Sequence, residues 1–360
     1  MILNGFFITK NPYAWEKCKL ENFVEITTGK LDANAMVNDG KYDFYTSGIK
    51  KFKINIPAFT GPAITIAGNG ATVGFMHLAD GEFNAYQRTY VLTKFSNSIR
   101  EFLFYEIGIK LPRKISAEAR TGNIPYIVMD MLTNLDVFTP TVPEQQKIGN
   151  LFKQLDHLIT LHKRKWDDVI LLKKALLQKM FPKNGSDFPE IRFPEFTDAW
   201  EKCKLGEIAT INPKSTLPQT FNYVDLESVV GTEMRSYKIE KLYSAPSRAQ
   251  RLAKYGDIFY QTVRPYQKNN YLFELDDENY VFSTGYAQIR SKIYPYFLFT
   301  LIQNDRFVNE VLDNCTGTSY PAINATDLKN ITIFISNNPI EQQKIGNLFK
   351  QLDRLITLHK

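Results

Sequence analysis

Residues 144–163 read EQQKIGNLFKQLDHLITLHK, and residues 341–360 read EQQKIGNLFKQLDRLITLHK. The two stretches differ at one position, where the first has His157 and the second has Arg354. The second follows the first at an offset of 341 − 144 = 197 residues. This spacing is far longer than the roughly 20–50-residue period of a solenoid, so it indicates duplication of a whole domain.

A shorter repeat, AWEKCKL, opens both halves of the chain, at 14–20 and again at 199–205. The chain therefore consists of two tandem units, each with a long variable body followed by the repeated stretch. A length of 360 residues also predicts two domains, each large enough for its own core.

The repeated stretch predicts an amphipathic helix, because its apolar residues recur at spacings of three and four. Both copies begin with a capping-box signal, Thr141-Val-Pro-Glu144 and Asn338-Pro-Ile-Glu341. The first copy continues to Met180, which predicts a rod of roughly 55 Å at about 1.5 Å per residue. A helix that long requires another long helix to cover its stripe, and the second copy is the candidate; the alternative is that each helix packs only on its own body. The predicted helix-pairing and partner-helix positions are Ile148, Leu151, Phe152, Leu155, Ile159, Ile345, Leu348, Leu352 and Ile356.

Composition restricts the class of protein without identifying it. A net charge of +6 is compatible with a polyanionic partner. Cys18, Cys203 and Cys315 form no CxxC pair, which favours a reducing compartment and neither a disulfide framework nor a zinc site. No apolar run is long enough for a membrane span, and the first residues lack a secretory layout, so we expect a cytoplasmic protein.

The two bodies are rich in short strand-like runs punctuated by glycine, with one helix predicted in each, near 99–109 and 295–312. Because the regular alternation of a parallel sheet is missing, the sequence predicts an α+β fold. The predicted domains are a first body at 1–140, a helix at 141–181, a proline-rich connector at 182–198, a second body at 199–337 and a shorter helix at 338–360.

No catalytic or metal-ligating residue is predicted. The stretch from Gly68 to Gly74 superficially resembles a dinucleotide or methyl-donor loop, but the sequence after it has strand character, so a β-turn is the favoured interpretation. Asn11-Pro-Tyr13 lacks the second proline of the tetrad NPPY and is interpreted as a turn. The four histidines are scattered, with no HExxH motif.

Four features together resemble the specificity subunit of a Type I restriction–modification system. They are the EQQKI…LD helix that closes each half, the lead-in PEIRFPEFTDAWEKCKLGEI, the elements NAYQRTYVL and FYQTVRPYQ that follow a GNG or GDI run, and the glycine–threonine loops ARTGNIPYI and CTGTSYPAI. The resemblance covers nearly the whole chain, including its duplicated order.

The resemblance implies two target-recognition domains, separated by two long antiparallel helices related by a pseudo-two-fold axis. It implies a non-catalytic subunit that reads a bipartite, asymmetric duplex DNA target and docks two modification (methyltransferase) subunits and the restriction (translocase/nuclease) subunits. S-adenosylmethionine and catalysis would belong to the partner. The first unit lacks the PEIRFPEFTD lead-in. The second helix reaches Lys360 at the point where the first helix still continues, so we expect another helix to cover the apolar residues on the early part of the first helix.

Candidate DNA contacts are polar and basic residues on probable loops, because bases are read by Arg, Lys, Asn and Gln and phosphates by Lys, Arg, Ser and Thr. In the first body they are Tyr45, Thr46, Ser47, Lys50, Lys51, Gln87, Arg88, Arg120, Thr121 and Asn123. In the second body they are Gln261, Thr262, Arg264, Tyr266, Lys268, Asn270, Thr316, Thr318, Ser319 and Tyr320. Two alternatives stay open: a helical adaptor that assembles proteins without reading DNA, and a stand-alone DNA-modifying enzyme.

Overall fold

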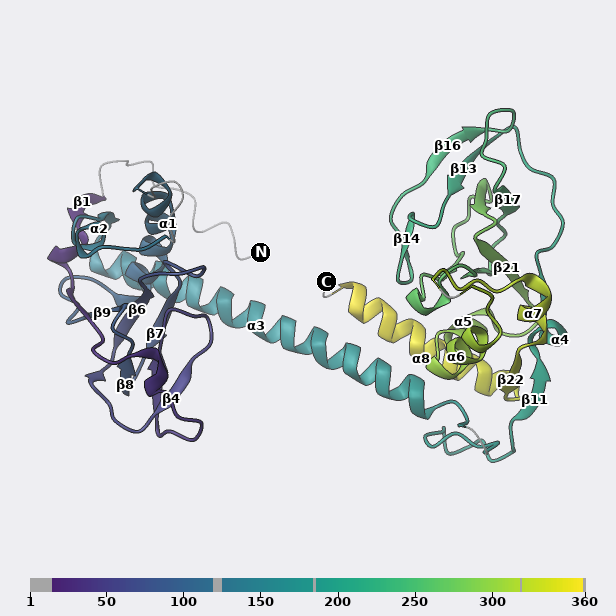
Figure 1. Ribbon diagram of the computed structural model, residues 1–360, viewed down its shortest axis with the longest axis horizontal. Helices are drawn as coiled ribbons and strands as arrows, with labels where there is room; N and C mark the ends of the chain where they lie inside the picture. The colour runs from purple at the N-terminus through teal and green to yellow at the C-terminus, as the bar shows by residue number, and fades with distance from the viewer. Residues whose placement is uncertain (1–14, 119–124, 184–185, 318, 359–360) are drawn as a thin grey trace. The chain divides into compact units, whose positions relative to one another are not determined.

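The computed structural model describes residues 15–118, 125–183, 186–317 and 319–358. The chain forms two compact units, Met1–Leu161 and His162–Lys360 (Figure 1). Within the described ranges, no helix is both long and apolar enough to cross a membrane.

The first unit contains two four-stranded sheets. One is antiparallel, in the order β2 (Glu25–Thr28), β9 (Thr89–Thr93), β6 (Ala63–Ala67) and β7 (Met76–Ala79). The other has the order β4 (Phe52–Ile54), β3 (Tyr42–Tyr45), β8 (Glu82–Ala85) and β5 (Phe59–Thr60), with β3 and β8 parallel. Strand β6 is buried along its whole length, which explains why AITIA has no polar alternation.

Two helices and a strand pair complete the first unit. Helix α1 (Arg100–Glu118) packs Leu103, Ile107 and Leu111 into the main core, together with Ile64 and Leu92 of the antiparallel sheet. The strand β1 (Glu16–Lys19), from the AWEKCKL repeat, pairs with β10 (Asp136–Thr139), which follows the short helix α2 (Met129–Thr133).

The second unit repeats this topology. Its first sheet has the order β12 (Ala209–Ile211), β21 (Tyr286–Ser291), β18 (Asp257–Gln261) and β19 (Tyr271–Leu272). Its second sheet has the order β16 (Lys238–Lys241), β13 (Thr220–Val224), β20 (Tyr280–Ser283) and β17 (Ala249–Leu252), with β13 and β20 parallel. A small hairpin is added, β14 (Val229–Val230) with β15 (Glu233–Met234). The repeat strand β11 (Glu201–Lys204) pairs with β22 (Thr332–Ile335), as β1 pairs with β10. The predicted α+β tandem duplication is therefore confirmed.

The helices of the second unit are α4 (Leu205–Ile208), α5 (Pro295–Ile302), α6 (Asp305–Asp313), α7 (Ala325–Asn330) and α8 (Pro339–Leu358). The single helix predicted over 295–312 is two helices. The chain breaks there because the Asn304 side chain accepts a hydrogen bond from the Arg306 backbone N–H at 2.9 Å and so caps a new helix.

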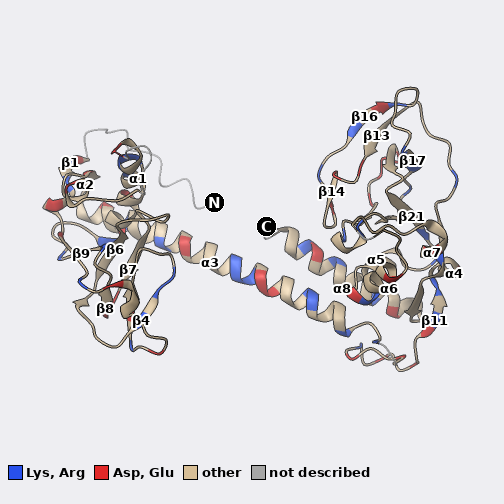
Figure 2. Ribbon diagram, in the orientation of Figure 1, with Lys and Arg blue, Asp and Glu red and all other residues tan. Residues whose placement is uncertain are grey.

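Helix α3 (Val142–Lys179) begins in the first unit and ends in the second, and positive and negative side chains alternate along it (Figure 2). In the second unit its later part pairs with α8. Trp166 Nε1 donates to the Ile356 carbonyl at 3.1 Å, and Lys173 forms an ion pair with Asp353. Numbers rise along α3 while they fall along α8, so this pair is antiparallel, as predicted.

The first glutamine of the repeated EQQKIGN sequence makes the same contacts in both units. Gln145 accepts from the Ile99 backbone N–H at 3.0 Å and donates to the Pro140 carbonyl at 2.9 Å. Gln342, one repeat later, accepts from the Tyr294 backbone N–H at 3.3 Å and donates to the Ser336 carbonyl at 2.7 Å. Each glutamine thus connects its helix to the segments just before it in the chain, the start of the preceding helix and the end of the preceding strand.

Candidate nucleic-acid interface

Two loops predicted separately in the second unit lie side by side in the structure. One follows β18 (residues 262–268, the reader loop), and the other precedes α7 (residues 316–322, the companion loop; Thr318 is outside the described residues). Arg264 N–H donates to the Pro321 carbonyl at 2.8 Å, and Ile323 N–H donates to the Thr262 carbonyl at 3.1 Å. Backbone hydrogen bonds therefore hold the two loops as one surface.

Three predicted DNA contacts in this unit are buried and act as scaffold instead. Asn270 is fully buried, and its side-chain oxygen accepts from the Gln261 backbone N–H at 2.8 Å. The Gln261 side chain donates to the Val263 carbonyl at 2.7 Å, and Thr262 Oγ1 donates to the Gly285 carbonyl at 2.8 Å. The prediction of direct contacts from Gln261, Thr262 and Asn270 is therefore wrong: their polar groups hold the backbone of the reader loop.

Lys268 is also engaged within the protein. Its ammonium donates to the Gln303 carbonyl at 3.0 Å and forms an ion pair with Asp305. This hydrogen bond lowers the pKa of the Asp305 carboxyl below its ordinary value. The contact attaches the end of the reader loop to the start of α6, so we assign Lys268 a positioning role.

The exposed side chains are Tyr266 on the reader loop and Thr316, Ser319 and Tyr320 on the companion loop, and Arg264 is half-buried beside them. Tyr266 is 50% exposed and Tyr320 is 64% exposed. The Arg264 guanidinium lies 4.3 Å from the centroid of the Tyr320 ring, which is a cation–π distance. Aromatic and arginine side chains together on a pair of loops provide both stacking and hydrogen-bonding groups for a nucleic acid.

The first unit builds the same pair of loops from different residues. The loop after β6 (residues 68–74) is joined to residues 125–128: Gly70 N–H donates to the Pro125 carbonyl at 3.2 Å, and Ile127 N–H donates to the Gly68 carbonyl at 2.7 Å. The predicted contacts Arg120, Thr121 and Asn123 lie outside the described residues. The 68–74 loop was interpreted only as a turn. Its place after a strand matching β18 is the signal that would have identified it as part of the site.

Two further loops of the first unit meet the 68–74 loop. Ser47 Oγ donates to Asn69 Oδ1 at 2.7 Å, and the Thr72 hydroxyl donates to the Ser47 carbonyl. The Arg88 carbonyl accepts from Gly68 N–H at 2.8 Å. The candidates Ser47, Lys50, Lys51, Gln87 and Arg88 are thus brought to one surface, and Thr46 is half-buried beside them.

Tyr45 is the one described candidate of the first unit that the structure removes from this surface. It is 2% exposed and packs edge-on against Phe83, with ring centroids 5.3 Å apart. Burial, reinforced by the nearby Asp43 carboxylate, raises the pKa of Tyr45 to about 12. Tyr45 is therefore a core residue, and the prediction that it contacts DNA is wrong.

The repeated helix has two different environments. Phe349 of α8 is fully buried and Leu352 is 6% exposed, whereas their repeat equivalents on α3, Phe152 and Leu155, are 42% and 43% exposed. Ile345 and Leu352 are core residues of the second unit with Leu348 packed against them, and the carbonyl of half-buried Ile356 bonds Trp166. These four positions are covered within the second unit and do not form a free surface.

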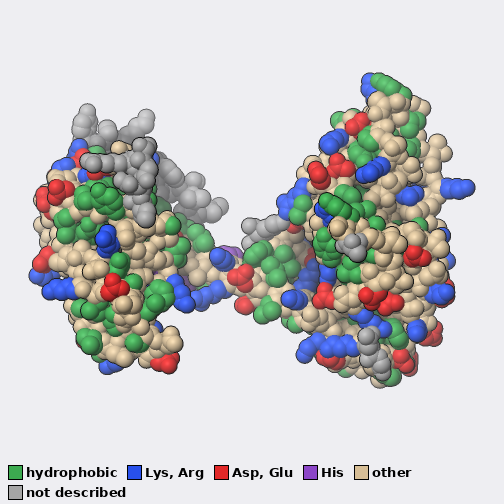
Figure 3. Space-filling view, viewed as in Figure 1, with side chains coloured by type: hydrophobic (Ala, Val, Ile, Leu, Met, Phe, Trp, Pro, Cys, Tyr) green, Lys and Arg blue, Asp and Glu red, His purple; other side chains and the backbone are tan. Residues whose placement is uncertain are grey.

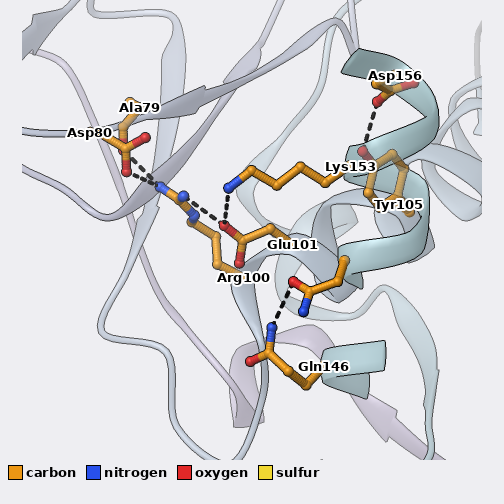
Figure 4. A network of polar contacts seen from close by, with 9 residues as sticks. Ala79, Asp80, Arg100, Glu101, Tyr105, Gln146, Lys153 and Asp156 are labelled. Atoms are coloured by element: carbon orange, nitrogen blue, oxygen red, sulfur yellow. Dashed lines mark hydrogen bonds and ion pairs between the residues drawn. The ribbon is translucent and has the colours of Figure 1, made fainter. Parts of the chain in front are cut away.

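The early part of α3 contacts α1 through polar side chains (Figure 4) and through the Phe152 ring, whose centroid lies 5.1 Å from that of Tyr105. Tyr105 donates to Asp156 at 2.7 Å, which with burial raises the tyrosine pKa, and Lys153 lies 3.7 Å from Glu101. Ile148 packs against the core, but Leu151, Phe152, Leu155 and Ile159 stay exposed among the described residues. We call these four residues the α3 stripe. Hydrophobic side chains are visible on the surface of both units in Figure 3.

Within the described ranges, no three His, Cys, Asp or Glu side chains are grouped closely enough to hold a metal ion. The three cysteines form no disulfide, and burial raises the pKa of Cys203 to about 11. A thiol with a raised pKa is a poor nucleophile at neutral pH.

Two tandem copies of an α+β domain, each closed by the same helix and each with outward-facing polar loops, define a duplicated recognition protein. The family described as the Type I restriction modification DNA specificity domain matches the chain twice, at residues 12–171 and 197–360. The chain belongs to this family, as the sequence resemblance indicated.

Related proteins agree with this assignment. The chain is 28% identical to the EcoDI specificity subunit of Escherichia coli, with 95% of this chain and 82% of that protein covered. It is 24% identical to the MjaVIII specificity subunit of Methanocaldococcus jannaschii, with 97% and 88% covered. The crystal structure of the Type I S subunit from M. genitalium has the same fold, with a TM-score of 0.67, 17% identity, and 98% and 93% coverage.

Proposed function

We propose that this chain is the non-catalytic DNA-recognition subunit of a Type I restriction–modification complex, and that each unit reads one half of a bipartite duplex target. The observation that carries this proposal is the pair of equivalent loop surfaces. The backbone hydrogen bonds at Gly70 and Arg264 are the same, whereas the side chains around them differ. A shared scaffold with different outward groups is what two unlike half-sites require.

The target is therefore asymmetric, and α3 sets the unread gap between its halves because this one helix belongs to both units. The protein would act in the cytoplasm, where the chromosome of a prokaryotic cell lies. Methyl transfer, S-adenosylmethionine binding and DNA cleavage would belong to the modification and restriction subunits.

The chain would also dock two modification subunits and the restriction subunits, and the α3 stripe supports the presence of a docking surface for such a partner. Contiguous exposed apolar side chains mark interaction surfaces. Phe349 and Leu352, the α8 equivalents of Phe152 and Leu155, are buried where the second unit packs on them. A solved structure of similar fold, at a TM-score of 0.50 and 17% identity, is described as showing complex assembly of the Type I system.

Binding of the assembled complex to duplex DNA tests the recognition role. We expect one duplex to be bound more tightly than a scrambled duplex, with an affinity that falls steeply as salt rises, because phosphate contacts release counterions. A complex that assembles but shows no preference among duplexes would support the adaptor alternative, for which the α3 stripe is the structural argument. Methyl transfer by this chain without partners would support the stand-alone enzyme.

A further inference from the structure

Arg264 and Gly70 occupy the same backbone position of the two units. Arg264 lies two residues after Thr262, and Gly70 lies two residues after Gly68; the carbonyls of Thr262 and Gly68 each accept from an isoleucine N–H. Arg264 and Gly70 each donate their own N–H to a proline carbonyl, at 2.8 Å and 3.2 Å. Both have a left-handed backbone, with φ of +55° at Arg264 and +88° at Gly70. Glycine adopts this conformation freely, whereas a residue with a Cβ is strained in it.

The fold itself therefore does not need a side chain here, since the first unit builds the same turn with glycine. An arginine at a strained position indicates that its side chain has a use that offsets the strain. Among the described residues, no carboxylate lies within ion-pair distance of the Arg264 guanidinium, and its side chain makes no hydrogen bond. Its neighbour in the loop, Lys268, is instead bound to Asp305.

The Arg264 Cζ lies over the Tyr320 ring, 4.3 Å from its centroid. A guanidinium held over a ring keeps N–H groups that can donate to a planar acceptor pair. Guanine offers such a pair in the major groove, N7 and O6, and a phosphate offers another. A phosphate contact would be needed equally in both units, yet the equivalent residue of the first unit, Gly70, has no side chain.

We propose that Arg264, oriented by Tyr320, reads a guanine in the half-site of the second unit, and that the first unit makes no base contact from the equivalent position, Gly70. This inference rests on the proposed DNA-recognition function. Arg264 is the specificity-determining residue, Tyr320 is a positioning residue, and the ligand is the N7/O6 edge of guanine in duplex DNA.

Methylation-site mapping of the complex assembled with its modification subunits tests this assignment with Arg264→Gly, which installs the residue of the first unit and removes the strain. We expect the variant to assemble and to lose a guanine preference of about 5- to 150-fold at one position of one half-site. The other half-site should be unchanged. An unaltered methylated sequence, or equally reduced methylation at all sites as for a lost phosphate contact, would overturn the assignment.

Two matched variants separate the side chain from the loop. Asn97→Gly changes an exposed left-handed residue of the first unit, φ +51°, outside the loops of the candidate interface, and should leave the methylated sequence as it is. Tyr320→Phe should retain the guanine preference, whereas Tyr320→Ala should weaken it at that position only. A changed motif in Asn97→Gly would show that relief of backbone strain, and not loss of the Arg264 side chain, alters the preference. A wild-type complex without any fixed target would instead refute the proposed function itself.

Discussion

Phe152 and Phe349 hold the same position in two copies of one helix sequence, but Phe152 is 42% exposed and Phe349 is fully buried. The difference has a local cause. The later part of α3 and the body of the second unit cover α8, whereas on early α3 the Tyr105 ring, 5.1 Å away between centroids, covers only part of Phe152. One sequence therefore has two roles, as core in α8 and as open surface in α3.

We expect Leu155→Asp to weaken assembly with the modification subunit by more than tenfold, because it places a charge in an apolar interface. The fold should be retained, because the side chain at this position is half-exposed in the free protein. Its matched control is Leu352→Asp, the equivalent position in the buried copy, which should unfold the second unit. Size-exclusion chromatography with light scattering and circular dichroism measure both. Full assembly by a folded Leu155→Asp protein would show that the stripe is not the docking surface.

Arg192 and Glu341 form a buried bidentate ion pair, with Arg192 Nε to Oε1 at 2.7 Å and Nη2 to Oε2 at 2.9 Å. Glu341 is fully buried, so Arg192→Met leaves a charge without its partner. We expect a loss of about 3–5 kcal/mol in the free energy of unfolding of the second unit. Hydrogen exchange resolved by unit measures it.

The control for that variant is Lys183→Ala, which breaks the exposed pair with Glu190 and should leave the stability of the second unit nearly unchanged. Adding Glu341→Gln to Arg192→Met should restore part of the loss, because it removes the unpaired buried charge. Equal stability of Arg192→Met and wild type would show that the Arg192–Glu341 ion pair does not stabilise the second unit.

Gly346 allows α8 to approach α5 closely. A Cβ at this position would lie 2.5 Å from the Tyr294 ring and 2.9 Å from the Phe297 backbone nitrogen. Gly346→Ala should therefore force the helices apart and destabilise the second unit by about 1–3 kcal/mol. Gly48→Ala, where the nearest atom would be 3.6 Å away, is the control and should change stability by less than about 0.5 kcal/mol. Urea denaturation of both variants is the measurement, and equal midpoints would contradict the packing argument.

His77 predicts a pH dependence for the first unit. Burial is the main cause that lowers its pKa below the ordinary value, Lys51 adds to this, and the Gly48 carbonyl and Asp43 oppose it. The unfolded chain therefore binds a proton before the folded chain does, so stability falls as pH drops from about 6.5 toward the lowered pKa. Thermal unfolding at pH 7.5 and 5.5 should show this loss, and His77→Gln should reduce it. A slope of opposite sign would contradict the assignment.

Several features could be predicted from the sequence because they depend on pattern alone. The repeat gave the duplication, and the spacing from Ile148 to Ile159 predicted the helix. Side-chain roles in the loops could not be predicted, because a buried amide such as Asn270 and an exposed one look alike until the strands around them are placed. The place of the Gly70 loop in the candidate site could not be predicted, because Gly70 and Arg264 are equivalent in backbone position and not in sequence.

The separation of the half-sites should respond to the length of α3. Inserting four residues after Thr160 adds one turn, about 6 Å, which corresponds to about one or two base pairs at ~3.4 Å each. We expect the gap in the methylated sequence to widen while both half-sites stay the same. A two-residue insertion is the control: it turns the flanking parts of the helix by about 200° relative to each other and should abolish methylation. A gap unaffected by the four-residue insertion would show that α3 is not the ruler.

The most direct test of the account is to replace residues 206–337, the body of the second unit, with the same body of a relative and to map methylation by the assembled complex. We expect a bipartite target in which one half-site takes a new sequence while the other half-site and the gap are unchanged. Changes in both half-sites, or in neither, would contradict the claim that each unit reads its own half of the target.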